Sequence, residues 1–129
     1  MKDLSGKIAV VTGGGTGMGR ELVRQLIAQG CDVATCDIVQ ENLEQTLDIG
    51  KKEAPQGVRL MGSICDVAKE KEVSKFREQV KDEFRTNHIN LLFNNAGIGG
   101  GGSFVKSEQS EWERCFNICW FGVYNFSRA

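Results

Sequence analysis

The chain has 129 residues, 40% of them hydrophobic, with 16 basic against 17 acidic side chains. This length accommodates one domain with a buried core, residues 1–129, and leaves no room for a second. The near balance of charge and the lack of a concentrated basic run argue against nucleic acid as a partner. No stretch approaches the ~18 apolar residues of a membrane span, and the start, Met1 to Gly6, holds no signal-peptide segment. We expect a soluble cytoplasmic protein without a membrane partner.

Five cysteines stand at positions 31, 36, 65, 115 and 119, together with one histidine, His88. The count is odd and contains no Cys-x-x-Cys pair, so we expect neither a disulfide framework nor a metal site. We interpret the cysteines as small buried hydrophobic residues in a reducing compartment.

Strand-like and helix-like segments alternate along the chain. Short apolar runs predict strands at 8–11, 32–36, 58–64 and 89–93. Helical patterns begin near residues 20, 69 and 108, and a further helix, with Leu43 and Leu47 on its inner face, follows the second strand. The first three helices in chain order end by Gly30, before Pro55 and near Arg85. The third helix carries a stripe of Val73, Phe76, Val80 and Phe84, and the last, with Ser107 as its cap, has Trp112, Cys115, Phe116, Cys119 and Val123 on one face. The glycine run 99–102 is interpreted as a flexible connection.

This alternation predicts an α/β fold with a parallel sheet and helices on both faces. Ligands of such sheets bind beyond the carboxyl ends of the strands. The sequence places a glycine-rich turn, Asp37, Asp66 and the run Asn94 to Gly97 at the ends of the four predicted strands. We therefore expect these four segments to converge on one crevice.

The glycine-rich turn runs from Thr12 to Gly19, directly between the first strand and its helix. Glycines let the backbone approach an anion closely, and the free N–H groups of the following helix point at it, so the turn predicts a phosphate site. A P-loop would need lysine and a hydroxyl where Arg20 and Glu21 stand. The Gly-x-Gly-x-x-Gly fingerprint counted from Gly13 would put Met18 in place of its third glycine.

The spacing Thr12-Gly13-x-x-x-Gly17-x-Gly19 resembles the cofactor turn of the short-chain dehydrogenase/reductase family. Two later features agree with it: Asp66-Val67 after the third strand and the run Asn94-Asn95-Ala96-Gly97 after the fourth. The resemblance extends from Gly6 to Ala129 and implies a Rossmann-type, doubly wound parallel sheet, cut after the fourth strand and its helix. Family members are about twice as long, so the chain resembles their N-terminal, cofactor-binding half.

The resemblance also implies roles for individual residues. Gly13, Gly17, Gly19 and the backbone of Thr16 and Met18 would line a pyrophosphate, Asp66 and Val67 an adenine, and Asn94, Ala96 and Gly97 the ribose region. Two alternatives remain open: Asn94 ties neighbouring strands together, and Thr12 serves the turn rather than the ligand.

Asp37, at the end of the second strand, indicates which cofactor is bound. A carboxylate there accepts hydrogen bonds from the adenosine ribose and repels a 2′-phosphate. Because Ile38 and Thr16 occupy the places where an NADP site would carry Arg or Lys, we predict NAD. The alternative role, as helix N-cap before Glu41, is compatible with the first.

The catalytic groups cannot be assigned within the chain. The resemblance implies a Tyr-x-x-x-Lys pair, whereas the single tyrosine, Tyr124, is followed by Arg128 and precedes the place where that pair belongs. Matching Trp112 and Gly122 to the family pattern puts Cys119 in the slot of its catalytic asparagine, with Asn117 two residues early. Two residues turn a helix by about 200°, so either Cys119 replaces the amide, which we favour, or a local irregularity brings Asn117 round.

The sequence thus favours an NAD-dependent oxidoreductase acting on a small alcohol or carbonyl substrate, with a homo-oligomer open. Its alternatives are a non-catalytic nucleotide-binding module and an inactive truncated product. A Tyr-x-x-x-Lys pair encoded after Ala129 would favour the enzyme, and a stop codon there would favour the others.

The fourth strand would lack its next neighbour in this chain alone, and an unpaired buried strand edge invites association. We therefore predict that residues 1–129 expressed alone are poorly soluble or oligomeric, as size-exclusion chromatography would report. A cooperative thermal transition of a monomer would contradict this prediction.

Overall fold

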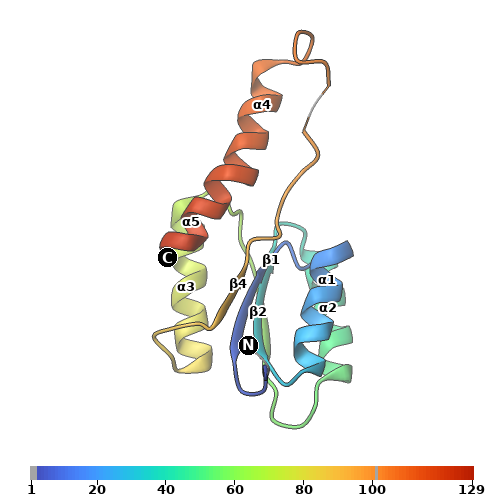
Figure 1. Ribbon diagram of the computed structural model, residues 1–129, viewed down its shortest axis with the longest axis vertical. Coiled ribbons are helices and arrows are strands. Elements are labelled where there is room, and N and C mark those ends of the chain that lie inside the picture. Colours follow the sequence, from blue (N-terminus) through green and yellow to red (C-terminus); the bar gives the residue numbers. More distant parts are fainter. Residues whose placement is uncertain (1–2, 101) are drawn as a thin grey trace.

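The computed structural model describes residues 3–100 and 102–129, so Met1, Lys2 and Gly101 of the glycine run lie outside the described residues. A four-stranded parallel sheet in the order β3-β2-β1-β4 forms its centre (Figure 1). Its strands are β1 Ile8–Thr12, β2 Asp32–Asp37, β3 Leu60–Ile64 and β4 Leu91–Phe93. The predicted parallel α/β sheet is confirmed, although β3 and β4 each begin two residues later than their apolar runs suggested.

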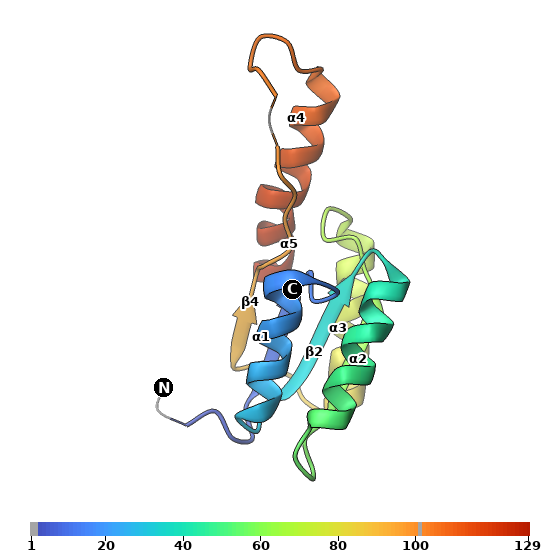
Figure 2. The ribbon, with the colours of Figure 1, turned by 90° about the vertical axis from the view of Figure 1, so that its right-hand side faces the viewer.

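Helices cover both faces of the sheet (Figure 2). The helices α1 and α2 lie together on one face, and α3 packs against α5 on the other. Their bounds are α1 Gly17–Ala28, α2 Gln40–Glu53, α3 Glu70–Phe84, α4 Gln109–Phe116 and α5 Gly122–Arg128. The doubly wound, Rossmann-type arrangement is therefore confirmed, and α4 with its preceding loop extends beyond the carboxyl ends of the strands (Figure 1).

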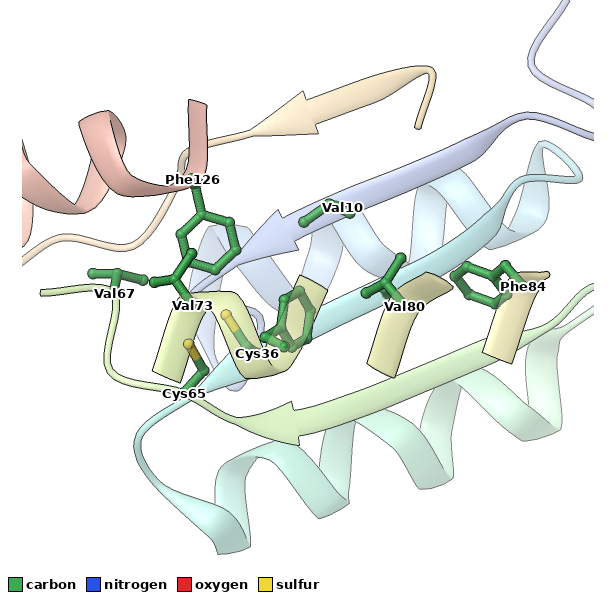
Figure 3. Packing of buried hydrophobic residues seen from close by; sticks show 10 residues of the cluster. Val10, Cys36, Cys65, Val67, Val73, Val80, Phe84 and Phe126 are labelled. Carbon is green, nitrogen blue, oxygen red and sulfur yellow. The ribbon is translucent and has the colours of Figure 1, made fainter. Parts of the chain in front are cut away.

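The alternation of side chains along β1 and β2 creates two separate cores. Val10 and Cys36 point to the α3 side, whereas Val11 and Val33 point to α1. The stripe predicted on α3 is buried as a whole, and Val73, Val80 and Phe84 lie against the sheet in Figure 3. Phe126 of α5 reaches the same core, with its ring centroid 5.7 Å from that of Phe76.

The cysteines divide between the core and the surface. Cys31, Cys36 and Cys65 are buried, as expected, whereas Cys115 is half-buried and Cys119 is exposed. The interpretation of all five as buried hydrophobic residues is therefore wrong for the two on the last helix.

The last helix is interrupted by a π turn, η1 Asn117–Phe121, between α4 and α5. A π turn adds one residue to the helical repeat, so side chains beyond it rotate away from their expected face. The predicted apolar face is wrong on both sides of the π turn. Before it, Phe116 is 58% exposed; beyond it, Val123 is 39% exposed, whereas Phe126 is buried. The predicted cap is also wrong, because the N-cap position belongs to Glu108 and not to Ser107.

Phe76 joins α3 to α5 in the larger core, so we predict that Phe76→Ala lowers the free energy of unfolding by about 3–5 kcal/mol. Urea denaturation of the full-length protein measures this loss. Lys75→Ala, on the exposed side of the same helix, should change it by less than about 0.5 kcal/mol. Equal losses in the two variants would contradict the prediction.

Candidate functional site

An open cleft of about 730 Å³ lies beyond the carboxyl ends of the strands. Its walls come from the turn after β1, the residues that follow β2, β3 and β4, and the first part of the last helix. The lining residues are Gly13, Thr16, Gly17, Met18, Gly19, Asp37, Ile38, Val39, Cys65, Asp66, Val67, Ala68, Asn95, Ala96, Gly97, Ile98, Ser110, Glu113, Arg114, Asn117 and Ile118. The convergence of four strand ends on one crevice is thus present in the structure.

Glycine is required at several positions of the turn, for different reasons. Gly13 and Gly17 have φ values of +67° and +52°, which L side chains rarely adopt. A Cβ on Gly13 would also stand 2.8 Å from the Cα of Ala96, and one on Gly19 would overlap the Gly13 carbonyl. The turn can therefore pack against both β4 and α1, while Gly17 faces open space in the cleft.

The N-terminus of α1 opens into the cleft. Its N-cap, Thr16, makes no side-chain capping bond, and its first turn contains no acidic residue. Thr16, Gly17 and Met18 are exposed, whereas Gly14 and Gly15 behind them are buried. The free N–H groups and the positive end of the helix dipole suit an anion such as a pyrophosphate.

Thr12 and Asn95 tie the turn to the end of β4. The Thr12 hydroxyl accepts from the Ala96 N–H at 2.9 Å and donates to the Phe93 carbonyl at 3.4 Å. The Asn95 amide donates to the carbonyls of Thr12 and Gly13 at 3.0 and 3.2 Å. Thr12 is 2% exposed, so it serves the turn rather than the surface of the cleft.

Asp37 stands at the edge of the cleft with its carboxylate fixed. Oδ2 accepts from the Gly15 N–H at 2.9 Å, and Oδ1 accepts from the Val39 N–H at 3.0 Å. Each oxygen keeps a lone pair for a further donor, so the carboxylate suits a pair of ribose hydroxyls. The alternative role as helix cap is wrong, because Val39 occupies the N-cap position of α2.

Asp66 and Val67 follow β3 and form the wall of the cleft next to Asp37, at the end of the neighbouring strand β2. The Asp66 carboxylate accepts from the Ala68 N–H at 3.0 Å, and the Asp66 N–H donates to the Glu72 carboxylate at 2.8 Å. The hydrogen bond from this N–H lowers the pKa of the Glu72 carboxyl most, and the hydrogen bond from the Lys69 ammonium lowers it further. Asn125 of α5 holds the Val67 carbonyl at 3.0 Å, so the loop is fixed from α3 and from α5.

Asn94 does not line the cleft. Its amide Nδ2 lies 3.4 Å from the Ser127 hydroxyl, and within the described residues its buried Oδ1 has no hydrogen-bond partner. The next residue, Asn95, lines the cleft instead. Successive side chains of an extended segment point to opposite sides, which is why two adjacent asparagines face different surroundings.

The two candidates for the asparagine slot also face different surroundings. Asn117 lines the cleft at the start of the π turn. The Cys119 thiol lies 3.6 Å from the Ile98 carbonyl, against the loop after β4. The helix thus has the local irregularity that a role for Asn117 requires, and the choice between the two residues stays a prediction.

Several lining residues were not predicted. Ser110, Glu113 and Arg114 come from α4, whose position beyond the strand ends has no sequence signal of its own. Tyr124 lies outside the cleft, and its hydroxyl accepts from the Arg128 guanidinium at 2.6 Å. Throughout the described ranges 3–100 and 102–129, side chains that bind metals do not gather in threes, and each helix is too short or too polar to cross a membrane.

The fold and the cleft are those of a nucleotide-binding α/β protein, and the comparisons identify the family. The short chain dehydrogenase family model matches residues 7–129, so the chain belongs to the short-chain dehydrogenase family. The resemblance drawn from the sequence is thereby confirmed.

Individual relatives agree with this assignment. A 3alpha-hydroxysteroid dehydrogenase of Mediterraneibacter gnavus is 31% identical over 98% of this chain and 49% of its own length. A short chain dehydrogenase/reductase from Burkholderia phymatum, solved in complex with NAD, has a TM-score of 0.90 at 30% identity, over 99% of this chain and 44% of that one. A variant of actinorhodin polyketide ketoreductase, solved with NADPH, has a TM-score of 0.87 at 29% identity, over 99% of this chain and 47% of that one. The chain spans less than half the length of the curated relatives it matches, 45% to 49% for several of them and 30% to 37% for others.

A methyl group on Gly19 would overlap the Gly13 carbonyl and lie 2.5 Å from the Asn95 amide. We predict that Gly19→Ala forces the turn apart, lowering the free energy of unfolding by about 1–3 kcal/mol and abolishing nucleotide binding. Gly99→Ala is the matched control, because a Cβ there meets nothing within 4 Å. Urea denaturation and NADH fluorescence titration measure both effects, and tight NADH binding by the Gly19 variant would contradict the prediction.

Proposed function

We propose that the full-length protein is an NAD-dependent oxidoreductase that transfers hydride between the nicotinamide and a small alcohol or carbonyl substrate. This chain supplies its cofactor-binding half. The observation that carries the proposal is the cleft in which the glycine turn, Asp37 and the loop at Asp66 meet. A bound nicotinamide would supply the hydride donor or acceptor, and residues of this chain would bind and orient it.

Each wall of the cleft would bind one part of the dinucleotide. The glycine turn and the first N–H groups of α1 would bind the pyrophosphate, since a backbone site of this kind needs no cation. Asp66 and Val67 would flank the adenine. Ala96 and Gly97, on the β4 side, would line the ribose region, and Asn117, which also lines the cleft, would extend this wall toward the nicotinamide.

The choice of NAD over NADP rests on Asp37. Relatives of the same fold are solved with NAD and with NADPH, so family membership does not decide it. A carboxylate held by two backbone N–H groups accepts from the ribose hydroxyls and repels a 2′-phosphate. In the described part of the chain, the one cation that lines the cleft is Arg114, on α4 and not beside Asp37.

We predict that the full-length protein binds NADH at least about tenfold more tightly than NADPH, and that Asp37→Ser weakens NADH about 10- to 100-fold. The loss follows because hydrogen bonds to a charged acceptor disappear. Fluorescence titration of both cofactors measures the two affinities, with Asp48→Ser on the exposed side of α2 as the control. Tighter binding of NADPH than of NADH by the unmodified protein would sink the choice of NAD, and failure to bind either would sink the proposed function.

A further inference from the structure

The buried half of the glycine turn is held by side chains that do not line the cleft. Thr46, on α2, is fully buried, and its hydroxyl lies 2.9 Å from the Gly14 carbonyl and 3.1 Å from the Gly15 carbonyl. Arg20, on α1, donates from Nη2 to the Gly15 carbonyl and from Nε to the Thr46 hydroxyl, the latter at 2.9 Å. Side chains of α1 and α2 thus form hydrogen bonds with the Gly14 and Gly15 carbonyls, on the side of the turn away from the cleft.

These contacts fix the direction of one peptide unit. The carbonyl of Gly14 and the N–H of Gly15 belong to the same planar peptide, so a donor on the carbonyl also orients the N–H. That N–H donates to Asp37 Oδ2 at 2.9 Å. The hydrogen-bonded path therefore runs from Thr46, through the Gly14–Gly15 peptide, to the carboxylate at the edge of the cleft.

Arg20 acts as a hydrogen-bond fork rather than as half of an ion pair. Its other acceptors are the Asn42 carbonyl and the Gln45 amide oxygen, both at 3.2 Å, and among the described residues no carboxylate lies within ion-pair distance of it. Arg24, one turn further along α1, differs: it ties α1 to α2 through Glu53 at 2.6 Å, away from the turn. The planar guanidinium has several donors in fixed directions, so it can bind a carbonyl and a hydroxyl at once. A lysine ammonium would fix the directions of these hydrogen bonds less well.

We propose that Thr46 and Arg20 are positioning residues of the nucleotide site, which set the preference for NAD by holding the Gly14–Gly15 peptide against the Asp37 carboxylate. This inference rests on the proposed function, because the ribose of NAD is the group that Asp37 would bind. Loss of Thr46 frees the Gly14–Gly15 peptide to rotate. Loss of Arg20 acts on this peptide through the Thr46 hydroxyl, which Arg20 holds, and also frees the Gly15 carbonyl of the next peptide. In both cases the carboxylate loses its orientation toward the ribose hydroxyls. NADPH gains nothing from Asp37, so its binding depends much less on this path.

The test uses the full-length protein and compares Thr46→Val, Thr46→Ser and Arg20→Gln with the control Arg24→Gln. We expect Thr46→Val and Arg20→Gln to weaken NADH about tenfold, the effect of one or two buried hydrogen bonds, and NADPH less than threefold. Thr46→Ser keeps the hydroxyl and should restore the affinity. Arg24→Gln should leave both affinities within twofold. Urea denaturation of each variant shows which of them are folded, and Thr46→Ser and Arg20→Gln carry the comparison if Thr46→Val does not fold.

A double-mutant cycle with Asp37→Ser separates positioning from general support of the turn. If Thr46 and Arg20 act through Asp37, their substitution has little further effect on NADH once Asp37 is replaced. Equal weakening of NADH and NADPH, or an undiminished effect in the Asp37→Ser background, would overturn the inference while leaving the proposed function intact. Absence of NADH binding by the unmodified protein would instead contradict the proposed function.

Discussion

The cleft depends on the close approach of backbone at Gly13 and Gly19. Because Gly19 has no Cβ, the start of α1 packs directly against the Gly13 carbonyl. Gly13 packs against the backbone of Ala96 for the same reason. Asn95 then closes the arrangement by donating to two carbonyls of β1 and the turn. These contacts with the main chain fix β1, α1 and the end of β4 relative to one another. As a result, the N–H groups of α1 face the cleft.

The turn has two sides with different tasks. Thr16, Gly17 and Met18 are exposed to the cleft, whereas Gly14 and Gly15 are buried under α2. The buried side is saturated with hydrogen bonds from side chains, and the exposed side keeps its N–H groups available. This division explains how a loop rich in glycine, which is flexible in isolation, can present donors in fixed directions: the order is imposed from behind by packing and hydrogen bonds.

Features that follow from the regular spacing of residues could be predicted from the sequence. Features that depend on where a side chain points in the folded chain could not. The stripe on α3 and the alternation of strands and helices follow from spacing, and the structure confirms them. The sequence predicted Asn94 in the cleft, whereas Asn95 lines it. Which of the two does so depends on where each side chain points after the end of β4. The π turn at Asn117 depends on backbone hydrogen bonds that no residue type specifies. The contact of Arg20 with Thr46 joins residues 26 positions apart, so only the packing of α1 on α2 reveals it.

The position of Arg20 bears on how the turn would bind phosphate. An arginine directly after the last glycine stands where a P-loop carries its lysine, and a cation there would be expected to reach the anion. In this fold its guanidinium is committed to carbonyls on the far side of the turn, with a hydroxyl and an amide as further acceptors. The pyrophosphate of the proposed cofactor would therefore meet backbone N–H groups and the helix dipole, without a cation from the turn. Since Asp37 adds a negative charge nearby, the lack of a cation from the turn supports the proposed preference for NAD over NADP, which carries one phosphate more.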